Sequence, residues 1–236
     1  MTNVRADLAP TGVLRASINL GNPVLAQGTP DEPGGVTVDI ARELARRLDV
    51  PLELVCFDAA RKSFEAMTTG QADLCFLAID PARADEVAFT APYVVIEGVF
   101  AVPAESQLRT VEDVDQPGVR IGVKQGSAYD LYLTRTLQQA TVVRGEEGTA
   151  VFEAEKLEVA AGIRQPITAF VAEHPETRLI DERFMQIQQA VGTTKARQPE
   201  TVAYLQSFVE DLKSTGFIAA SLQAAGQGDA QVAPPA

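Results

Sequence analysis

The sequence predicts an α/β protein made of two α/β lobes. Apolar segments of strand length alternate with segments whose apolar positions have helical spacing, which is typical of βαβ units with mostly parallel sheets. The alternation starts again after residue 103, so we expect two lobes of similar construction. One apolar run, at 74–79, stops abruptly at Asp80-Pro81. Asp is a preferred helix N-cap and Pro a preferred first helical residue, so a buried strand ends there and a helix begins.

The expected elements follow in order. In the first half, strands are expected at 13–18, 52–57, 73–79 and 98–103, and helices at 36–48 and 62–69. In the second half, strands are expected at 119–123, 141–143, 157–161 and 185–191, and helices at 128–137, 149–155 and 166–173. A last helix is indicated by an apolar stripe with helical spacing: Val202, Leu205, Phe208, Val209 and Leu212.

Composition excludes several classes of function. The 236 residues carry a net charge of −12, which argues against nucleic acid or an anionic membrane surface as partner. No run approaches eighteen apolar residues, so no membrane span is expected. Residues 1–10 lack the apolar core of a signal peptide, which leaves two alternatives: a removed signal or a cytosolic protein.

The residues with redox or metal chemistry are few. Cys56 and Cys75 fall in two separate apolar strands, and we expect free thiols rather than a disulfide. With His174 as the single histidine, no metal-site spacing is present, and neither a metal nor a cofactor is predicted.

Arg83 is the leading candidate for a binding residue. It lies in the first turn after the strand at 74–79, and ligands of open α/β sheets bind outside the carboxyl ends of strands. A guanidinium held there is a fork-shaped receptor for a carboxylate. The alternative is that Arg83 pairs with Asp80 or Glu86 on a solvated helix face.

Several blocks together resemble a known family. They read LAIDPAR at 77–83 with EVAFTAPY at 86–93, GGVTVDI at 34–40, and VRIGVKQGS at 119–127. In their order along the chain they resemble the type II periplasmic solute-binding proteins, and within these the polar amino-acid family that serves ABC importers. The likeness covers roughly residues 12–222.

The resemblance implies a two-lobed fold with a ligand cleft between the lobes and two hinge crossovers, near 101–103 and 190–192. It implies that the last helix packs on the first lobe. We therefore expect lobe 1 at 12–101 and 192–225 and lobe 2 at 104–190. The tail at 226–236, rich in Gly, Ala, Gln and Pro, is expected to be disordered. A monomer outside the cytoplasm with an ABC permease as partner is also implied.

Four segments are expected to line the cleft. Lobe 1 would supply the loop after the first strand and the turn after the third, and lobe 2 a helix start and the end of a strand. By the resemblance, Arg83 and the helix capped by Ser127 hold the ligand's carboxylate, since helix N-termini favour anions. For Ser127 the alternative is a plain cap without ligand contact. The expected ligand-binding residues are Asn19, Asn22, Ala78, Arg83, Gly126, Ser127, Ala128, Tyr129, Arg164 and Gln165.

The departures from the family pattern indicate the ligand. Ala78 replaces a hydroxyl donor, and 160–165 lacks the acid that binds an α-ammonium in the family. Arg164 instead adds a cation, so we expect a carboxylate ligand without a free α-ammonium, such as a dicarboxylate, a keto acid or an acylated amino acid. Arg164 as a surface residue is the alternative, and Asp58 or Glu97 could supply the missing acid.

Two other classes of function stay open. Cyclohexadienyl dehydratases resemble these binding proteins and use an acid for proton transfer. Here the acids Asp58, Asp80 and Glu97 lie away from the expected site, and Asp80 is expected to be used in capping, so no catalytic residue is predicted. A cytosolic ligand sensor without a transporter is the third alternative.

Overall fold

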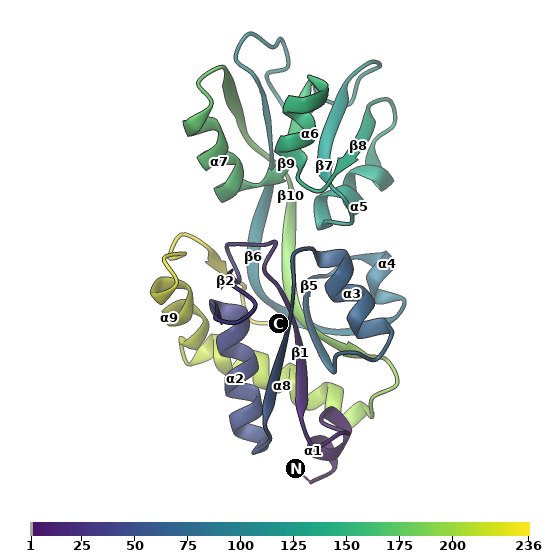
Figure 1. The fold of residues 1–236 in the computed structure, drawn as a ribbon, viewed down its shortest axis with the longest axis vertical. Helices are drawn as coiled ribbons and strands as arrows, with labels where there is room; N and C mark the ends of the chain where they lie inside the picture. The colour runs from purple at the N-terminus through teal and green to yellow at the C-terminus, as the bar shows by residue number, and fades with distance from the viewer. Residues whose placement is uncertain (1) are drawn as a thin grey trace. The chain divides into compact units, whose positions relative to one another are not determined.

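The computed structural model describes residues 2–236 and divides the chain into two compact units (Figure 1). Unit 1 comprises the chain up to Val95 and from Gln188 onward, and unit 2 comprises Ile96–Ile187. The predicted crossings at 101–103 and 190–192 lie a few residues later than these divisions. No loop marks either division, because each falls inside a long strand: β6 (Val87–Pro103, 17 residues) or β10 (Thr177–Thr194, 18 residues).

Unit 1 is organised on parallel strands. Strand β1 pairs in parallel with β4 on one side and β5 on the other, and β10 runs antiparallel to β5. Figure 1 shows helices α2 and α3 on opposite sides of these strands, as right-handed crossovers require. The elements of unit 1 besides parts of β6 and β10 are α1 (Thr2–Leu8), β1 (Leu14–Asn19), β2 (Gln27–Gly28), β3 (Pro33–Gly34), α2 (Val36–Leu48), β4 (Leu52–Phe57), α3 (Ala60–Thr68), β5 (Leu74–Ala78), α4 (Pro81–Ala84), α8 (Pro199–Ser214), α9 (Phe217–Ala224) and β11 (Gln231–Val232).

Helix α2 shows how the local sequence sets an element. Its apolar residues recur at helical spacing and all are buried: Ile40, Ala41, Leu44, Ala45 and Leu48. The helix starts after Gly35, whose φ of +94° suits glycine, and a Cβ there would lie 2.7 Å from the carbonyl oxygen of Leu25. It ends at Asp49, which adopts the left-handed conformation.

Unit 2 repeats the α/β construction. Strand β7 pairs in parallel with β8 and β9, and β9 runs antiparallel to β6. Its core includes Val99, Ala101, Phe152, Leu157 and Ile167, contributed by β6, by helices α6 and α7, and by the turn after α6. The elements besides parts of β6 and β10 are β7 (Arg120–Lys124), α5 (Ala128–Thr136), β8 (Thr141–Gly145), α6 (Gly148–Glu155), β9 (Val159–Ile163) and α7 (Arg164–Glu173). The α/β class is thus confirmed.

The prediction of a disordered tail at 226–236 is wrong. Strand β11 pairs antiparallel with Val94 and Val95 of β6, and the Ala233 amide donates to the Tyr93 carbonyl at 3.0 Å. The Lys213 ammonium donates to the carbonyl of Pro234 at 2.9 Å. These bonds use backbone atoms, which composition does not describe, and small side chains such as Ala233 become buried without strain.

The N-terminal helix α1 has no counterpart among the predicted elements. Leu8 is fully buried, and the Asp7 carboxylate accepts a hydrogen bond from the Gln198 amide at 2.9 Å. This short helix is ordered by tertiary contacts, which its own polar sequence does not reveal. None of the described helices is both long and apolar enough to cross a lipid bilayer.

The prediction of free cysteines is confirmed. Cys56 lies on β4 and Cys75 on β5, and β1 separates these strands in the sheet. Burial raises the pKa of the Cys75 thiol to about 12, so this cysteine is an inert core residue.

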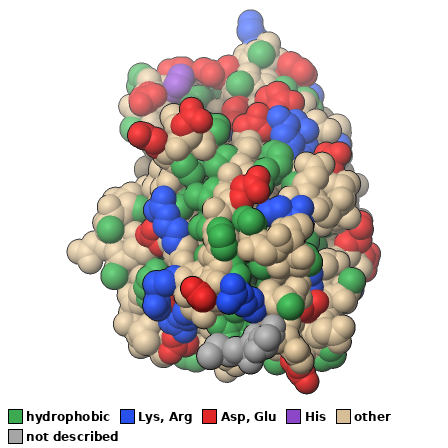
Figure 2. Space-filling model, turned by 60° about the horizontal axis from the view of Figure 1, so that its bottom comes forward, with side chains coloured by type: hydrophobic (Ala, Val, Ile, Leu, Met, Phe, Trp, Pro, Cys, Tyr) green, Lys and Arg blue, Asp and Glu red, His purple; other side chains and the backbone are tan. Residues whose placement is uncertain are grey.

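On the face shown in Figure 2, acidic and basic side chains are interspersed.

Candidate functional site

The turn after β5 has the predicted construction. All five residues of β5 are buried, and the strand ends at Ala78. The Asp80 carboxylate accepts a hydrogen bond from the Ala82 amide at 2.9 Å, and Pro81 occupies the first turn of α4. The predicted cap is thus confirmed, and Asp80 is used in fixing the turn.

Arg83 is buried in this turn, with 4% of its surface exposed. One guanidinium nitrogen, Nη1, donates to the carbonyl oxygen of Ala78 at 3.1 Å. Burial lowers the pKa of Arg83, and the nearby Asp80 carboxylate opposes this shift. Ala78 therefore acts through its backbone, by positioning the guanidinium at the carboxyl end of β5. Desolvation is costly for a cation, so this position suits binding of an anion.

The loop after β1 contains the two predicted asparagines. The side-chain oxygen of Asn19 accepts from the Gly21 amide at 3.0 Å, so Asn19 shapes the loop. Gly21 is required there, because a Cβ would lie 2.1 Å from the Asp58 carbonyl oxygen. Asn22 is 6% exposed, and its buried Oδ1 has no hydrogen-bond partner among the described residues. Asn22 is therefore the residue of this loop that a ligand could satisfy.

Ser127 caps helix α5, as predicted: its Oγ accepts from the Asp130 amide at 3.1 Å. A second acceptor at this helix start, Asp130, is not among the predicted site residues. The Asp130 carboxylate accepts from the Gly126 amide at 2.8 Å and is held by Arg144, whose Nε lies 3.0 Å from both oxygens. This arrangement is similar to a capping box, except that the Asp130 carboxylate binds the amide of the residue before the N-cap.

Two of the residues expected to bind the ligand lie in the first turn of α5, where a helix leaves backbone amides without an acceptor. Ala128 and Tyr129 are the first two helical residues, whose amides have no acceptor within the helix. The Tyr129 side chain is buried, and this burial raises the pKa of its phenol. The backbone of this segment thus suits a ligand better than the Tyr129 ring does.

The structure corrects the expectation for Arg164. Its Nε donates to Glu97 at 2.6 Å and its Nη1 to Asp181 at 2.9 Å, so acids of unit 2 neutralise the guanidinium. Glu97 also accepts from Arg183 at 2.9 Å, and the two arginines lower the pKa of its carboxyl group. Arg164 is therefore not an additional anion receptor, and Glu97 is not the spare acid.

Gln165 differs from Arg164 although the two are adjacent at the start of α7. The side-chain Oε1 of Gln165 is buried, and the described part of the chain offers it no hydrogen-bond donor. A buried acceptor without a donor costs roughly 1–3 kcal/mol. Gln165 and Asn22 thus share one property: each holds a buried amide oxygen that a ligand donor would satisfy.

Within each unit, the predicted residues come to one edge of the sheet. Strands β1 and β5 are parallel neighbours, so the loop with Asn22 and the turn with Arg83 follow adjacent carboxyl ends. Strands β7 and β9 are also parallel neighbours, so residues 126–129 and Gln165 follow adjacent carboxyl ends in unit 2. These are the strand ends at which α/β sheets bind ligands.

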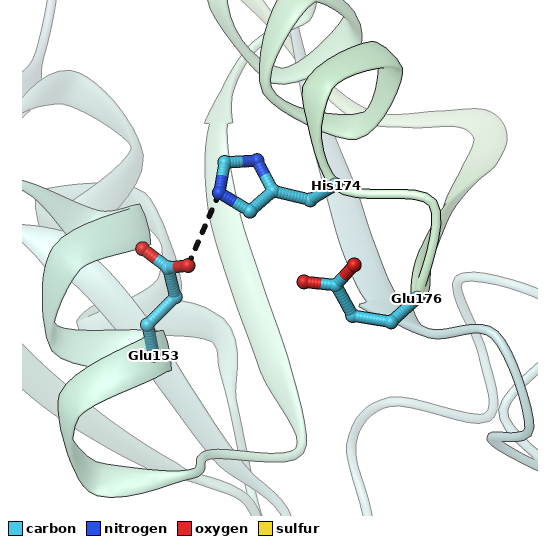
Figure 3. A group of neighbouring side chains, drawn as sticks. All are labelled: Glu153, His174 and Glu176. Atoms are coloured by element: carbon cyan, nitrogen blue, oxygen red, sulfur yellow. Dashed lines mark ion pairs between the residues drawn. The ribbon is translucent and has the colours of Figure 1, made fainter.

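One group of possible metal ligands lies elsewhere in unit 2. Glu153, His174 and Glu176 place their ligand atoms within 4.8 Å of one another (Figure 3). The prediction of no metal site considered only His and Cys spacings. The His-Pro-Glu sequence at 174–176 was the available signal, because it places two ligand types two residues apart.

Comparison with known proteins agrees with this architecture. Residues 18–224 match the model of the bacterial extracellular solute-binding proteins, family 3. No curated protein matches the chain.

Solved structures share the fold at low sequence identity. The P235GK mutant of ArgBP from T. maritima has a TM-score of 0.76 and 21% identity, over 94% of this chain and 98% of that one. The cysteine-binding protein from Campylobacter jejuni has a TM-score of 0.77 and 18% identity, over 94% and 92%. The ancestral amino acid-binding protein AncCDT-1, a precursor of cyclohexadienyl dehydratase, has a TM-score of 0.75 and 19% identity, over 93% and 98%. Because the family model covers most of its length, the chain belongs to family 3 of the bacterial extracellular solute-binding proteins.

Proposed function

We propose that the protein captures a small, amino-acid-like carboxylate ligand and delivers it to an ABC importer. Each unit would supply the loops at one edge of its sheet, and the units would close on the ligand by bending along β6 and β10. The observation that carries the proposal is the buried guanidinium of Arg83 at the carboxyl end of β5. Membership of an extracellular solute-binding family supports the transport role and a location outside the cytoplasm.

The carboxylate is inferred from the donors at the two edges. A guanidinium binds a carboxylate through paired N–H groups, and desolvation strengthens that bond. In unit 2, the amides of Ala128 and Tyr129 at the positive end of α5 would donate hydrogen bonds to the same carboxylate. Asp130 already neutralises part of this helix end, so Arg83 would contribute most of the affinity.

The α-nitrogen of the ligand is inferred from the two buried amide oxygens. Arg164 is paired with Glu97 and Asp181. Only the absence of an acid at 160–165 therefore disfavours a ligand with a free ammonium. Asn22 Oδ1 and Gln165 Oε1 are neutral acceptors, which bind an N–H of an ammonium or of an amide. We therefore propose a ligand whose α-nitrogen carries at least one N–H and need not be charged.

An enzyme on the same scaffold is the second candidate, favoured by the likeness to the dehydratase precursor AncCDT-1. Proton transfer needs an acid or base that is available to the substrate. Asp80 is a helix cap, and Glu97 accepts from two arginines. These interactions favour the binding function over the catalytic one. Turnover of a cyclohexadienyl substrate by the purified protein would reverse this preference.

Thermal unfolding with matched ligand pairs tests the proposal. Each amino acid is compared with its N-acetyl and its deaminated counterpart, and a ligand at 100 times its Kd adds about 2.7 kcal/mol to the free energy of unfolding. We expect a raised Tm with an amino acid and with its N-acetyl form, and a smaller rise without the nitrogen. A shift with free amino acids alone would require an acid at the α-nitrogen. No shift with any carboxylate would contradict the proposal.

Arg42→Ala is the matched control for Arg83→Ala, because Arg42 is a solvent-exposed arginine of unit 1 on helix α2. The control should keep the ligand-induced shift, and Arg83→Ala should lose it. Small-angle X-ray scattering with and without the ligand then measures closure, which should reduce the radius of gyration.

A further inference from the structure

The cluster of Glu153, His174 and Glu176 lies outside every segment of the proposed ligand site. Glu153 comes from α6, His174 ends α7, and Glu176 stands in the turn that leads into β10. Figure 3 shows the imidazole and the two carboxylates around a common space, with a dashed line that joins His174 to Glu153. Figure 2 shows the chain's single histidine at the surface beside acidic side chains.

The hydrogen bonds of His174 define which ring nitrogen can bind a cation. Nδ1 lies 2.8 Å from the carbonyl oxygen of Phe170, and because a carbonyl only accepts, Nδ1 carries a hydrogen. In the neutral ring, Nε2 then has a lone pair, and it lies 3.2 Å from the Glu153 carboxylate. Two acceptors face each other at that distance only with a cation between them. The cation is either a proton on Nε2 or a metal ion.

The surroundings hold the cluster in place before any metal binds. The Phe170 ring stacks on the imidazole at 4.1 Å between centroids. Thr177 donates to the His174 carbonyl from its amide at 2.8 Å and from its hydroxyl at 2.7 Å. The Glu176 carbonyl accepts from the Ala104 amide at 2.8 Å. Metal-binding histidines commonly donate their other N–H to a backbone carbonyl, as His174 does.

We propose that these three residues bind one Zn²⁺, with His174 Nε2 and one oxygen each of Glu153 and Glu176 as ligands. Ligands of tetrahedral zinc at about 2.0–2.2 Å lie about 3.3–3.5 Å apart, close to the 3.2 Å between His174 and Glu153. Glu176 reaches this spacing by a side-chain rotation, because its carboxylate is exposed and within 4.8 Å of the others. Water completes the coordination.

The donor set and the local charge select zinc. A nitrogen with two carboxylate oxygens suits borderline transition metals, whereas Ca²⁺ and Mg²⁺ prefer oxygen ligands alone. His174 lies at the carboxyl end of α7, and Glu153 lies in the last turn of α6. Helix carboxyl ends carry partial negative charge, which favours a cation.

The zinc site is separate from the proposed ligand site. His174 follows the carboxyl end of α7, and Gln165 lies near its amino end, about 14 Å away along the axis at 1.5 Å per residue. The ion would therefore act as a structural link between α6 and the turn after α7. Loss of zinc binding and loss of ligand binding can be measured independently.

Isothermal titration of the whole chain with ZnCl₂ tests the proposal in a non-chelating buffer. We expect one zinc per chain in the wild type, with affinity at least tenfold weaker in His174→Gln and severalfold weaker in Glu153→Gln and in Glu176→Gln. Glu112→Gln, which removes an exposed acid of unit 2 outside the cluster, should bind zinc like the wild type. CaCl₂ and MgCl₂ should give no comparable binding.

Thermal unfolding gives a second readout. Saturating zinc should raise the Tm of the wild type and of Glu112→Gln but not that of His174→Gln. Wild-type zinc affinity in His174→Gln would place the ion elsewhere and overturn the proposal. Absence of zinc binding in the wild type would also overturn it, and would leave the contact as an ion pair of a protonated His174. His174→Gln should keep the ligand-induced Tm shift in either case.

Discussion

The two units each place an arginine just after a parallel strand, and the surroundings of these arginines differ. Arg83 follows β5, is 4% exposed, and is bound by the carbonyl of Ala78. Arg164 follows β9, has a side chain that is 28% exposed, and is bound by the carboxylates of Glu97 and Asp181. An arginine near the carboxyl end of a strand is therefore almost fully buried in one unit, and in the other it is more exposed and paired with two acids. The environment, and not the residue type, makes an arginine suitable for ligand binding.

The largest expected effect is that of Arg83→Ala. Removing one partner of a buried, charge-assisted bond typically costs about 2–5 kcal/mol, or roughly 30-fold to more than 1,000-fold in Kd. Isothermal titration with the best ligand from the thermal screen measures this loss. The apo protein should keep nearly the same Tm, because the lost packing is offset by removal of a costly buried charge. Binding that survives Arg83→Ala would show that the assignment of the ligand site is wrong.

Unlike Arg83→Ala, Arg164→Gln should lower the stability of the protein and leave its affinity for the ligand nearly unchanged. The free energy of unfolding should fall by about 1 kcal/mol, because Glu97 and Asp181 lose a partner in a partly solvated network. The Kd for the ligand should change less than threefold. Urea unfolding and titration of the same preparation measure both quantities. An affinity loss as large as that of Arg83→Ala would restore Arg164 as an anion receptor.

The smallest expected effect is the pH dependence of the Glu97 network. The two arginines lower the pKa of Glu97 in the folded state, so the stabilisation is fully present above the ordinary glutamate pKa of about 4.3. It is lost as the pH falls through the folded pKa. Glu97→Gln should therefore be less stable than the wild type at pH 7, and this difference should shrink as the pH falls below the ordinary glutamate pKa. A difference that is constant with pH would show that charge does not cause it.

The local features of the candidate site could be predicted from the sequence. The caps at Asp80 and Ser127 depend on residues within three positions of each other, and both are confirmed. Positions that depend on pairing between distant segments could not be predicted. The partners of Arg164 are Glu97, 67 residues away, and Asp181, 17 residues away, and only the arrangement of β6, β9 and β10 brings them together.

The dependence on contacts between distant segments also explains the other differences between the predicted and the observed structure. The capping role of Asp130 could have been predicted from the local sequence, because an acid three residues after a Ser cap is a capping-box pattern. The tail and helix α1 were not, since their order comes from contacts with residues more than 100 positions away. The cluster of Glu153, His174 and Glu176 also joins distant segments. Glu153 is on α6 and His174 directly follows α7, and β9 separates these two helices.

The pairing of β11 with β6 also occupies backbone groups that could otherwise pair with another chain. Val94 and Val95 belong to a strand rich in β-branched and aromatic residues, and an uncovered edge of such a strand is a template for pairing with another chain. The C-terminal segment covers these two residues with its own backbone, and Pro234 and Pro235 follow after Ala233. Proline has no amide hydrogen, so these two residues cannot donate the hydrogen bonds that would continue the β-ladder.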